Sequence, residues 1–117
     1  MALRNYYTLL NRQQLDSGEY LFTVRLNPDC EVYKGHFPNQ PVAPGVCQLQ
    51  LIKDCAELVL GRDLRIVRIK QCKFLKMILP AEVDTLDICL SISEDLSLLA
   101  SVRSGETVYV KLKAELQ

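Results

Sequence analysis

One segment of the chain has the apolar spacing of an α-helix, and every other patterned segment alternates like a strand. The helical segment runs from Gly45 to Leu60, and Gly61 follows it as a stop. Its apolar side chains recur at positions 46, 49, 52, 56 and 59, and its polar side chains at 50, 53, 54 and 57. Further leucine and cysteine residues widen the apolar surface, so we expect a helix that other elements wrap around.

Six segments carry the alternation of strands with one buried face. Two precede the helix, at 6–15 and 20–27, and the turn residues between them predict an antiparallel hairpin. Four follow it, at 64–74, 83–93, 96–104 and 106–116, and a Ser104–Gly105 turn joins the last two. The pattern predicts an α+β fold in which the sheet covers the helix. At 117 residues, we expect a single domain spanning 1–117.

Composition excludes several classes of function. The chain has 14 basic and 14 acidic residues and no Trp, so no net charge favours nucleic acid or an anionic membrane. No segment has the length of a membrane span, and the N-terminus lacks the apolar region of a signal peptide. The five cysteines are odd in number and form no CxxC pair, which argues against a disulfide framework or a metal site. We therefore expect a cytoplasmic protein that binds no metal.

The only histidine, His36, lies in the stiffest segment of the chain, "HFPNQPVAPG". Pro38, Pro41 and Pro44 fix their own φ angles and restrict the residues before them. The segment ends at Gly45, where the unpaired N–H groups of a helix start favour developing negative charge. A histidine held here can act as a base while those amides hold an oxyanion. The alternative is a lone structural or surface histidine.

The segment resembles the signature of the β-hydroxyacyl-(acyl-carrier-protein) dehydratases of fatty-acid synthesis, the FabZ/FabA-like family. That pattern is HFP, two residues, P, two residues, PG and an apolar residue, followed by a helix. Seven residues of the chain match it in register: His36, Phe37, Pro38, Pro41, Pro44, Gly45 and Val46. A weaker resemblance continues through "CKFLKMILPAEVDTLDICLSI", so that about four-fifths of the chain is similar to the family.

The resemblance implies a hot-dog fold, in which a curved antiparallel sheet wraps a long central helix. It also implies homodimers, sometimes assembled into trimers of dimers, with active sites and an acyl tunnel at the dimer interface. The resemblance further implies that His36 abstracts the C2 proton of a 3-hydroxyacyl thioester. The Gly45 and Val46 amides polarise the thioester carbonyl, and Phe37 contributes to substrate binding. The substrate arrives on the phosphopantetheine of an acyl carrier protein or of coenzyme A, and neither a metal nor a redox cofactor is implied.

The chain departs from the family pattern at two positions of the helix. Fourteen residues after the histidine the family has Glu or Asp, supplied to the site of the partner subunit, and here that residue is Gln50. An amide orients a hydroxyl or a water but donates no proton as a general acid. Four residues later the family usually has Gln, and here the residue is Asp54. Positions four apart share a helix face, so Asp54 is either the displaced acid or part of a solvated stripe.

Other interpretations stay open at this point. An acyl thioesterase would use Asp54 to activate water, and a non-catalytic acyl-binding or partner subunit would keep the fold without the acid. Cys47 with His36, the loop residue Tyr33, and Ser101 or Ser104 are weaker catalytic candidates. Because the chain is shorter than usual for the family at its N-terminus, we expect a secondary acyl pathway, such as the assembly of lipid-like molecules or polyene pigments.

Overall fold

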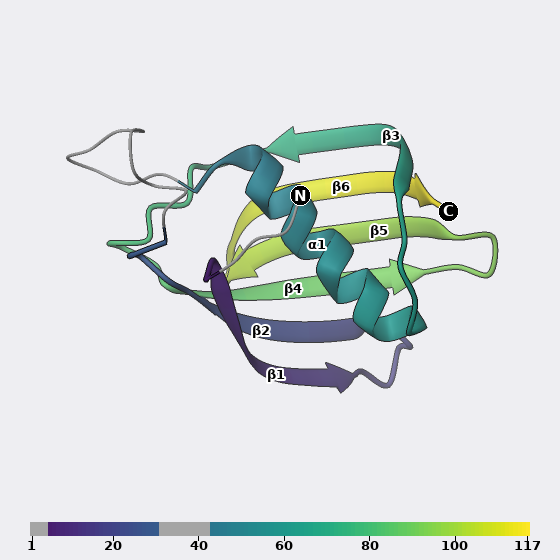
Figure 1. Cartoon of the computed structure of the whole chain (residues 1–117), viewed down its shortest axis with the longest axis horizontal. Helices are drawn as coiled ribbons and strands as arrows, with labels where there is room; N and C mark the ends of the chain where they lie inside the picture. The colour runs from purple at the N-terminus through teal and green to yellow at the C-terminus, as the bar shows by residue number, and fades with distance from the viewer. Residues whose placement is uncertain (1–4, 31–42) are drawn as a thin grey trace.

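The structure is a computed structural model that describes residues 5–30 and 43–117. It consists of one antiparallel sheet in the order β1-β2-β4-β5-β6-β3, with a single helix lying across one face (Figure 1). The elements in chain order are β1 (Tyr7–Gln14), β2 (Tyr20–Leu26), α1 (Gly45–Leu60), β3 (Ile66–Phe74), β4 (Thr85–Ile92), β5 (Ser97–Ser104) and β6 (Thr107–Leu116). The α+β arrangement predicted from the sequence is confirmed.

The core lies between α1 and the sheet face that it covers. Strand register brings the inward side chains of β2, β4, β5 and β6 into rows that cross the sheet. One such row is formed by Phe22, Ile88, Val102 and Val110, each at most 1% exposed. Because alternate residues of a strand point to one face, the period-2 pattern of the sequence places these side chains against the helix.

The helix begins and ends where the sequence predicts. Pro44 precedes it with an extended backbone (φ −65°, ψ 145°), and Gly61 ends it in the left-handed region (φ 68°), where its N–H donates to the Glu57 carbonyl. The buried face is rotated from the predicted one. Val46 is 62% exposed, whereas Gln48, which the predicted stripe omits, is 1% exposed.

The two edge strands are largely exposed on both faces, unlike the four between them. β3 leaves its outer edge unpaired, and both Val67 and Ile69 expose about half of their surface. Its pairing with β6 shifts register between Ile66 and Arg68 and again between Ile69 and Gln71. Such irregularities are common on edge strands, where they limit uncontrolled pairing.

The observed strands agree with the predicted ones to within two residues at each end. The difference at β5 has a local cause: Leu96 adopts a positive φ of 65° in the β4–β5 turn, so the strand begins at Ser97. The predicted hairpin of 6–15 with 20–27 is present as the β1–β2 pair. The predicted Ser104–Gly105 turn joins β5 to β6, with Gly105 at a φ of 59°.

Candidate active site

The first turn of α1 begins with backbone N–H donors that are of interest for binding. No acidic residue lies in this turn, and no side chain of the described residues caps it. The carbonyl of Pro44 accepts the N–H groups of Cys47 and Gln48, but the amides of Gly45 and Val46 lie ahead of the first helical hydrogen bonds. The positive end of the helix dipole is therefore available to an acceptor group of a ligand.

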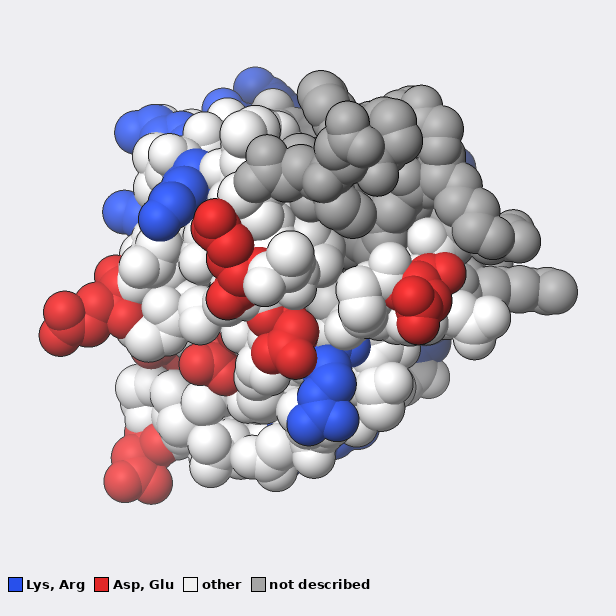
Figure 2. All heavy atoms as spheres, turned by 90° about the vertical axis from the view of Figure 1, so that its left-hand side faces the viewer, with Lys and Arg blue, Asp and Glu red and all other residues white. Residues whose placement is uncertain are grey.

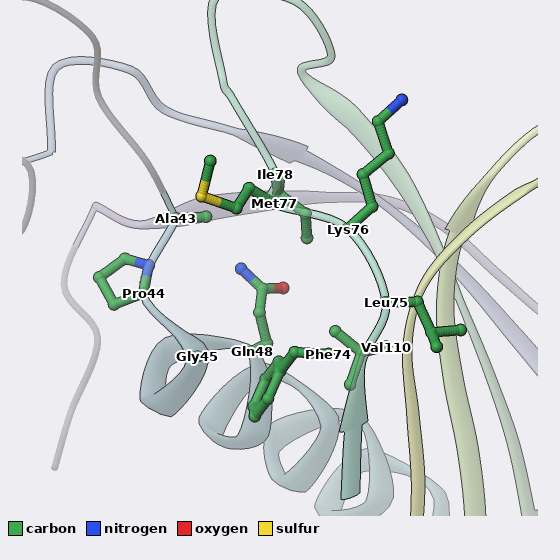
Figure 3. Close-up of a pocket in the computed structure, with 10 residues that line it drawn as sticks. All are labelled: Ala43, Pro44, Gly45, Gln48, Phe74, Leu75, Lys76, Met77, Ile78 and Val110. Carbon is green, nitrogen blue, oxygen red and sulfur yellow. The ribbon is translucent and has the colours of Figure 1, made fainter.

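A cavity of about 520 Å³ opens beside this turn. It is bounded by the start of α1, the end of β3, the connection from β3 to β4, and one residue of β6 (Figure 3). Ten residues line it: Ala43, Pro44, Gly45, Gln48, Phe74, Leu75, Lys76, Met77, Ile78 and Val110. Most of these side chains are apolar, and the Lys76 side chain extends away from the centre in Figure 3. The cavity suits an apolar chain whose polar end meets the helix N-terminus.

Two contacts hold the walls of the cavity together. The N–H of Ala43 donates to the carbonyl of Ile78 (2.8 Å), which ties the residue before the helix to the β3–β4 connection. The Phe74 ring packs over Gly45, where a Cβ atom would lie only 2.9 Å from its Cζ atom. A glycine is therefore what permits the ring to lie this close to the helix start.

Among the described residues, Gln48 is the one polar side chain at the centre of the cavity (Figure 3). Its Nε2 donates to the Tyr6 hydroxyl at 2.7 Å, and Tyr6 is fully buried. Its Oε1 is buried and accepts no hydrogen bond from any described residue. A buried acceptor without a donor carries a desolvation cost, so this atom is an unmet hydrogen-bonding site in an apolar wall.

Gln50 and Asp54 form a hydrogen-bonded pair on α1. Gln50 Nε2 donates to Asp54 Oδ1 at 2.9 Å, and the Tyr7 hydroxyl of β1 donates to Asp54 Oδ2 at 3.1 Å. The spacing of four residues brings the two helix side chains together, as predicted. Nearby, Lys53 pairs with Glu57 at 3.4 Å, so the polar side of the helix is an ordered network rather than a fully solvated stripe.

The predicted site residues that the structure describes do not all converge within one chain. Gly45 and Asp54 are nine residues apart, or two and a half turns, and so leave the helix on opposite sides. Gly45 lines the cavity beside β3, whereas Asp54 contacts β1; Val46 does not line the cavity. His36 and Phe37 lie outside the described residues, as does Tyr33.

The alternative nucleophiles lie in unfavourable places. Cys47 and Cys55 are buried, and burial raises the pKa of both thiols, that of Cys55 to about 12. A raised pKa disfavours the reactive thiolate, which opposes a Cys47–His36 pair. Ser101 and Ser104 are both on β5, and neither lines the cavity. Among the described residues no group of three or more His, Cys, Asp or Glu side chains could hold a metal ion.

The end of the molecule at which α1 begins carries acidic and basic side chains together. Figure 2 shows Lys and Arg mainly toward the upper left of this face and Asp and Glu across its middle and lower left. Neither sign of charge covers the visible surface alone. The cavity itself is lined mainly by apolar side chains. No helix in the described part of the chain is long and apolar enough to cross a membrane.

Sequence reasoning missed Gln48 and Tyr7. Gln48 lies four residues before Ile52, and both are buried on the same face of the helix. A glutamine on the same helix face as buried apolar residues was the feature of the sequence that could have indicated a buried polar group. Tyr7 reaches Asp54 across 47 residues of sequence, and no local pattern indicates that contact.

Removing the Tyr7 hydroxyl tests the network around Asp54. Tyr7→Phe should lower the free energy of unfolding by about 0.5–1.5 kcal/mol at neutral pH, because it deletes one donor to a part-buried carboxylate. Urea unfolding measures the change. The control is Tyr20→Phe on β2, whose hydroxyl makes no hydrogen bond within the described ranges, and which should change stability less. Equal losses in the two variants would show that the Asp54 contact contributes nothing.

The same variant has a pH signature. Burial, reinforced by the Asp54 charge, raises the pKa of Tyr7 above its ordinary 10.0. Above pH 10 the unfolded chain loses this proton while the folded chain keeps it, so the folded state binds more protons and stability falls as pH rises. Tyr7→Phe should lack this part of the decrease in stability. Above pH 10 its free energy of unfolding should therefore approach that of the unmodified chain.

Comparison with known sequences places the chain in a family. The profile of the ApeI-like family, described as ApeI dehydratase, matches residues 12–111. A curated relative is the 3-hydroxyacyl-[acyl-carrier-protein] dehydratase FabZ of Levilactobacillus brevis, 30% identical over 90 residues. The match covers 68% of this chain and 61% of the relative, so the chain spans about three-fifths of the length of that protein.

Solved structures agree with the fold. The dehydratase heterocomplex ApeI:P of Xenorhabdus doucetiae contains a chain with a TM-score of 0.79 and 24% identity, over 93% of this chain and 96% of that one. An uncharacterised protein of Erwinia carotovora subsp. atroseptica matches with a TM-score of 0.71 and 28% identity, over 94% and 92%. The helix wrapped by a six-stranded antiparallel sheet is the hot-dog fold that the sequence resemblance implied. With the profile match over most of its length, the chain belongs to the ApeI-like family of hot-dog dehydratases.

Proposed function

We propose that the protein dehydrates a 3-hydroxyacyl thioester to the trans-2-enoyl thioester, or catalyses the reverse hydration. The observation that carries the proposal is the N-terminus of α1, which no described side chain caps, with Gly45 lining an apolar cavity. An acyl chain fits the apolar wall, and a thioester carbonyl that gains negative charge as the C2 proton leaves is stabilised by helix N-terminal amides. Family membership supports the same reaction class.

The proposed reaction breaks the C2–H and C3–O bonds and releases water. His36 takes the C2 proton, because it is the only histidine and its segment leads directly into the helix start. The Gly45 and Val46 amides hold the carbonyl oxygen, and Phe37, the next residue of the motif after His36, contributes to substrate binding. The C3 hydroxyl leaves with a proton donated by Asp54 or by water that Gln50 orients. The reaction involves no net oxidation or reduction, so it needs no redox cofactor.

We propose that the complete site forms between two copies of the chain. Gly45 and Asp54 leave α1 on opposite sides, so one copy cannot bring both to a single substrate. A homodimer solves this if the Gln50–Asp54 pair of one copy faces the helix start of the other.

The proposed substrate is carried on phosphopantetheine, either of an acyl carrier protein or of coenzyme A. The Levilactobacillus relative is an acyl-carrier-protein dehydratase, and the proposal extends that carrier class and fatty-acid metabolism to this chain. A cytoplasmic location agrees with Cys47, Cys55, Cys72 and Cys89 being free thiols.

A second candidate function is that of a non-catalytic subunit. Gln50 replaces the acid of the family, and both oxygens of Asp54 already accept hydrogen bonds within the chain. The solved Xenorhabdus protein is a dehydratase heterocomplex, and this second proposal extends assembly with a different chain to the present protein. In that case the chain alone would bind an acyl carrier without turning it over.

A single assay separates these functions. The purified protein is incubated with a 3-hydroxyacyl thioester, and both enoyl absorbance and free thiol are followed. Dehydration predicts enoyl product and no free thiol. Free thiol without enoyl product would instead indicate an acyl thioesterase. If neither product forms while the acyl carrier binds, the chain is a non-catalytic subunit.

A further inference from the structure

We propose that Gln48 recognises the 3-hydroxyl group of the substrate, and so distinguishes the 3-hydroxyacyl thioester from its enoyl product and from saturated acyl thioesters. The inference rests on the proposed function and adds a specificity-determining residue to it. Gln48 is 1% exposed, lines the cavity, and leaves its Oε1 without a donor from the described residues.

The chemistry of Oε1 restricts what can occupy the cavity beside it. Because Nε2 is already engaged with the Tyr6 hydroxyl, the amide presents an acceptor to the cavity rather than a donor. The ligand must therefore bring an O–H or N–H group to an otherwise apolar wall. Within the acyl part of a 3-hydroxyacyl thioester, the 3-hydroxyl is the only such group. The enoyl product has none.

The positions of Gly45 and Gln48 fit that substrate. Residues three apart lie on the same helix face, and the rise between them is about 4.5 Å. The amide donors at the helix start and the Gln48 acceptor thus line the same cavity in succession. When the thioester carbonyl binds the amides at the helix start, C3 lies two carbons further along the acyl chain, on the side of Gln48 Oε1. The cavity wall then offers amide donors to the thioester carbonyl oxygen, and the Gln48 Oε1 acceptor to the 3-hydroxyl group.

The recognition also compensates in part for the change at position 50. The family acid holds the leaving hydroxyl, and Gln50 with Asp54 lies on the opposite side of the helix from the cavity in the same chain. Gln48 supplies an additional contact to the hydroxyl from the chain that binds the carbonyl. As an amide it orients that group and takes no part in proton transfer.

Binding of matched ligands tests this role. Dissociation constants are measured by calorimetry for 3-hydroxyhexanoyl-pantetheine, hexanoyl-pantetheine and trans-2-hexenoyl-pantetheine. A His36→Ala background prevents turnover of the first ligand. With Gln48 intact, the hydroxyacyl ligand should bind about 5- to 10-fold more tightly than the other two, the effect of one added neutral hydrogen bond. Gln48→Met, which keeps the length of the side chain and removes the acceptor, should abolish that preference.

Two control variants separate recognition from a structural role. Tyr6→Phe removes the partner of Nε2 but keeps Oε1, so it should retain the hydroxyl preference even if stability falls. Leu51→Met changes the buried face of the same helix outside the cavity, and should leave all three constants unchanged. If Tyr6→Phe loses the preference as Gln48→Met does, Gln48 serves only to hold Tyr6 and the inference is overturned.

The remaining outcomes are decisive as well. An equal loss of affinity for all three ligands in Gln48→Met would mean that the acceptor meets a pantetheine amide, which all three share, or a bound water. A preference unchanged by Gln48→Met would place the hydroxyl elsewhere. Either result overturns the role of Gln48 while enoyl formation by the unmodified chain still supports the dehydratase. Binding of none of the ligands would overturn this inference together with the proposed function.

Discussion

His36→Ala should lower the rate of enoyl formation by about 10²–10⁴-fold, the range contributed by a positioned general base. It is the only histidine of the chain, and burial raises the pKa of the Cys47 and Cys55 thiols, which disfavours a thiolate base at either position. The amides of Gly45 and Val46 are backbone groups that the substitution leaves in place, so substrate binding should change less than turnover. The rate is followed by enoyl absorbance at saturating substrate.

The control for this variant comes from the same proline-rich segment. Gln40→Ala alters a polar side chain between Pro38 and Pro41 without touching the titratable group, and should retain most of the activity. Thermal unfolding of both variants checks that the fold persists. Turnover by His36→Ala at the rate of the unmodified chain would remove His36 from the mechanism, and the base would have to be sought elsewhere.

Most of the fold could be predicted because its signals are local. Pro44 and Gly61 delimit the helix through backbone geometry that these two residues strongly favour. Alternation in β4, β5 and β6 fixes which side chains point to the core. The rotation of the helix was less well determined, because apolar residues occupy more than half of its circumference. Tertiary packing then decided that Gln48 is buried and Val46 is exposed.

The site was predictable only in part, for a geometric reason. The i,i+4 spacing correctly predicted that Gln50 and Asp54 lie side by side. It could not show that Tyr7 binds the same carboxylate, because that contact depends on how β1 folds over the helix. The family motif also groups residues by sequence, whereas the turn of the helix separates Gly45 from Asp54 within one chain. Prediction of the full site therefore depends on how two copies pair.

Mixing two inactive variants should restore activity if each site is built from two chains. The proposed dimer combines His36 and Gly45 of one copy with Asp54 of the other. Both His36→Ala and Asp54→Asn should therefore be inactive alone. Asp54→Asn preserves the size of the side chain and an oxygen that accepts from Tyr7, so it removes the carboxylate with little change in packing. Refolding the two together in equal amounts should give mixed dimers in which one site carries both functional groups.

The size of the recovery is set by symmetry. About half of the dimers formed at random are mixed, and each has one intact site of two, so activity should reach about a quarter of that of the unmodified protein. The double variant His36→Ala/Asp54→Asn provides the complementary experiment, in which both substitutions are on the same chain. Refolded with the unmodified chain, it should leave about a quarter of the sites intact if the groups come from different copies, and about half if they come from one copy.

These two mixtures decide between the hypotheses about Asp54. Recovery in the first mixture and the lower value in the second would assign the acid to Asp54 of the partner copy, despite the hydrogen bonds that it accepts from Tyr7 and Gln50. Full activity of Asp54→Asn on its own would instead make the carboxylate an anchor between α1 and β1. The leaving hydroxyl would then receive its proton from water oriented by Gln50, and Gln50→Ala should abolish the activity. The activities of the two mixtures, relative to that of the unmodified protein, therefore test whether Gly45 and Asp54 act from different copies of the helix.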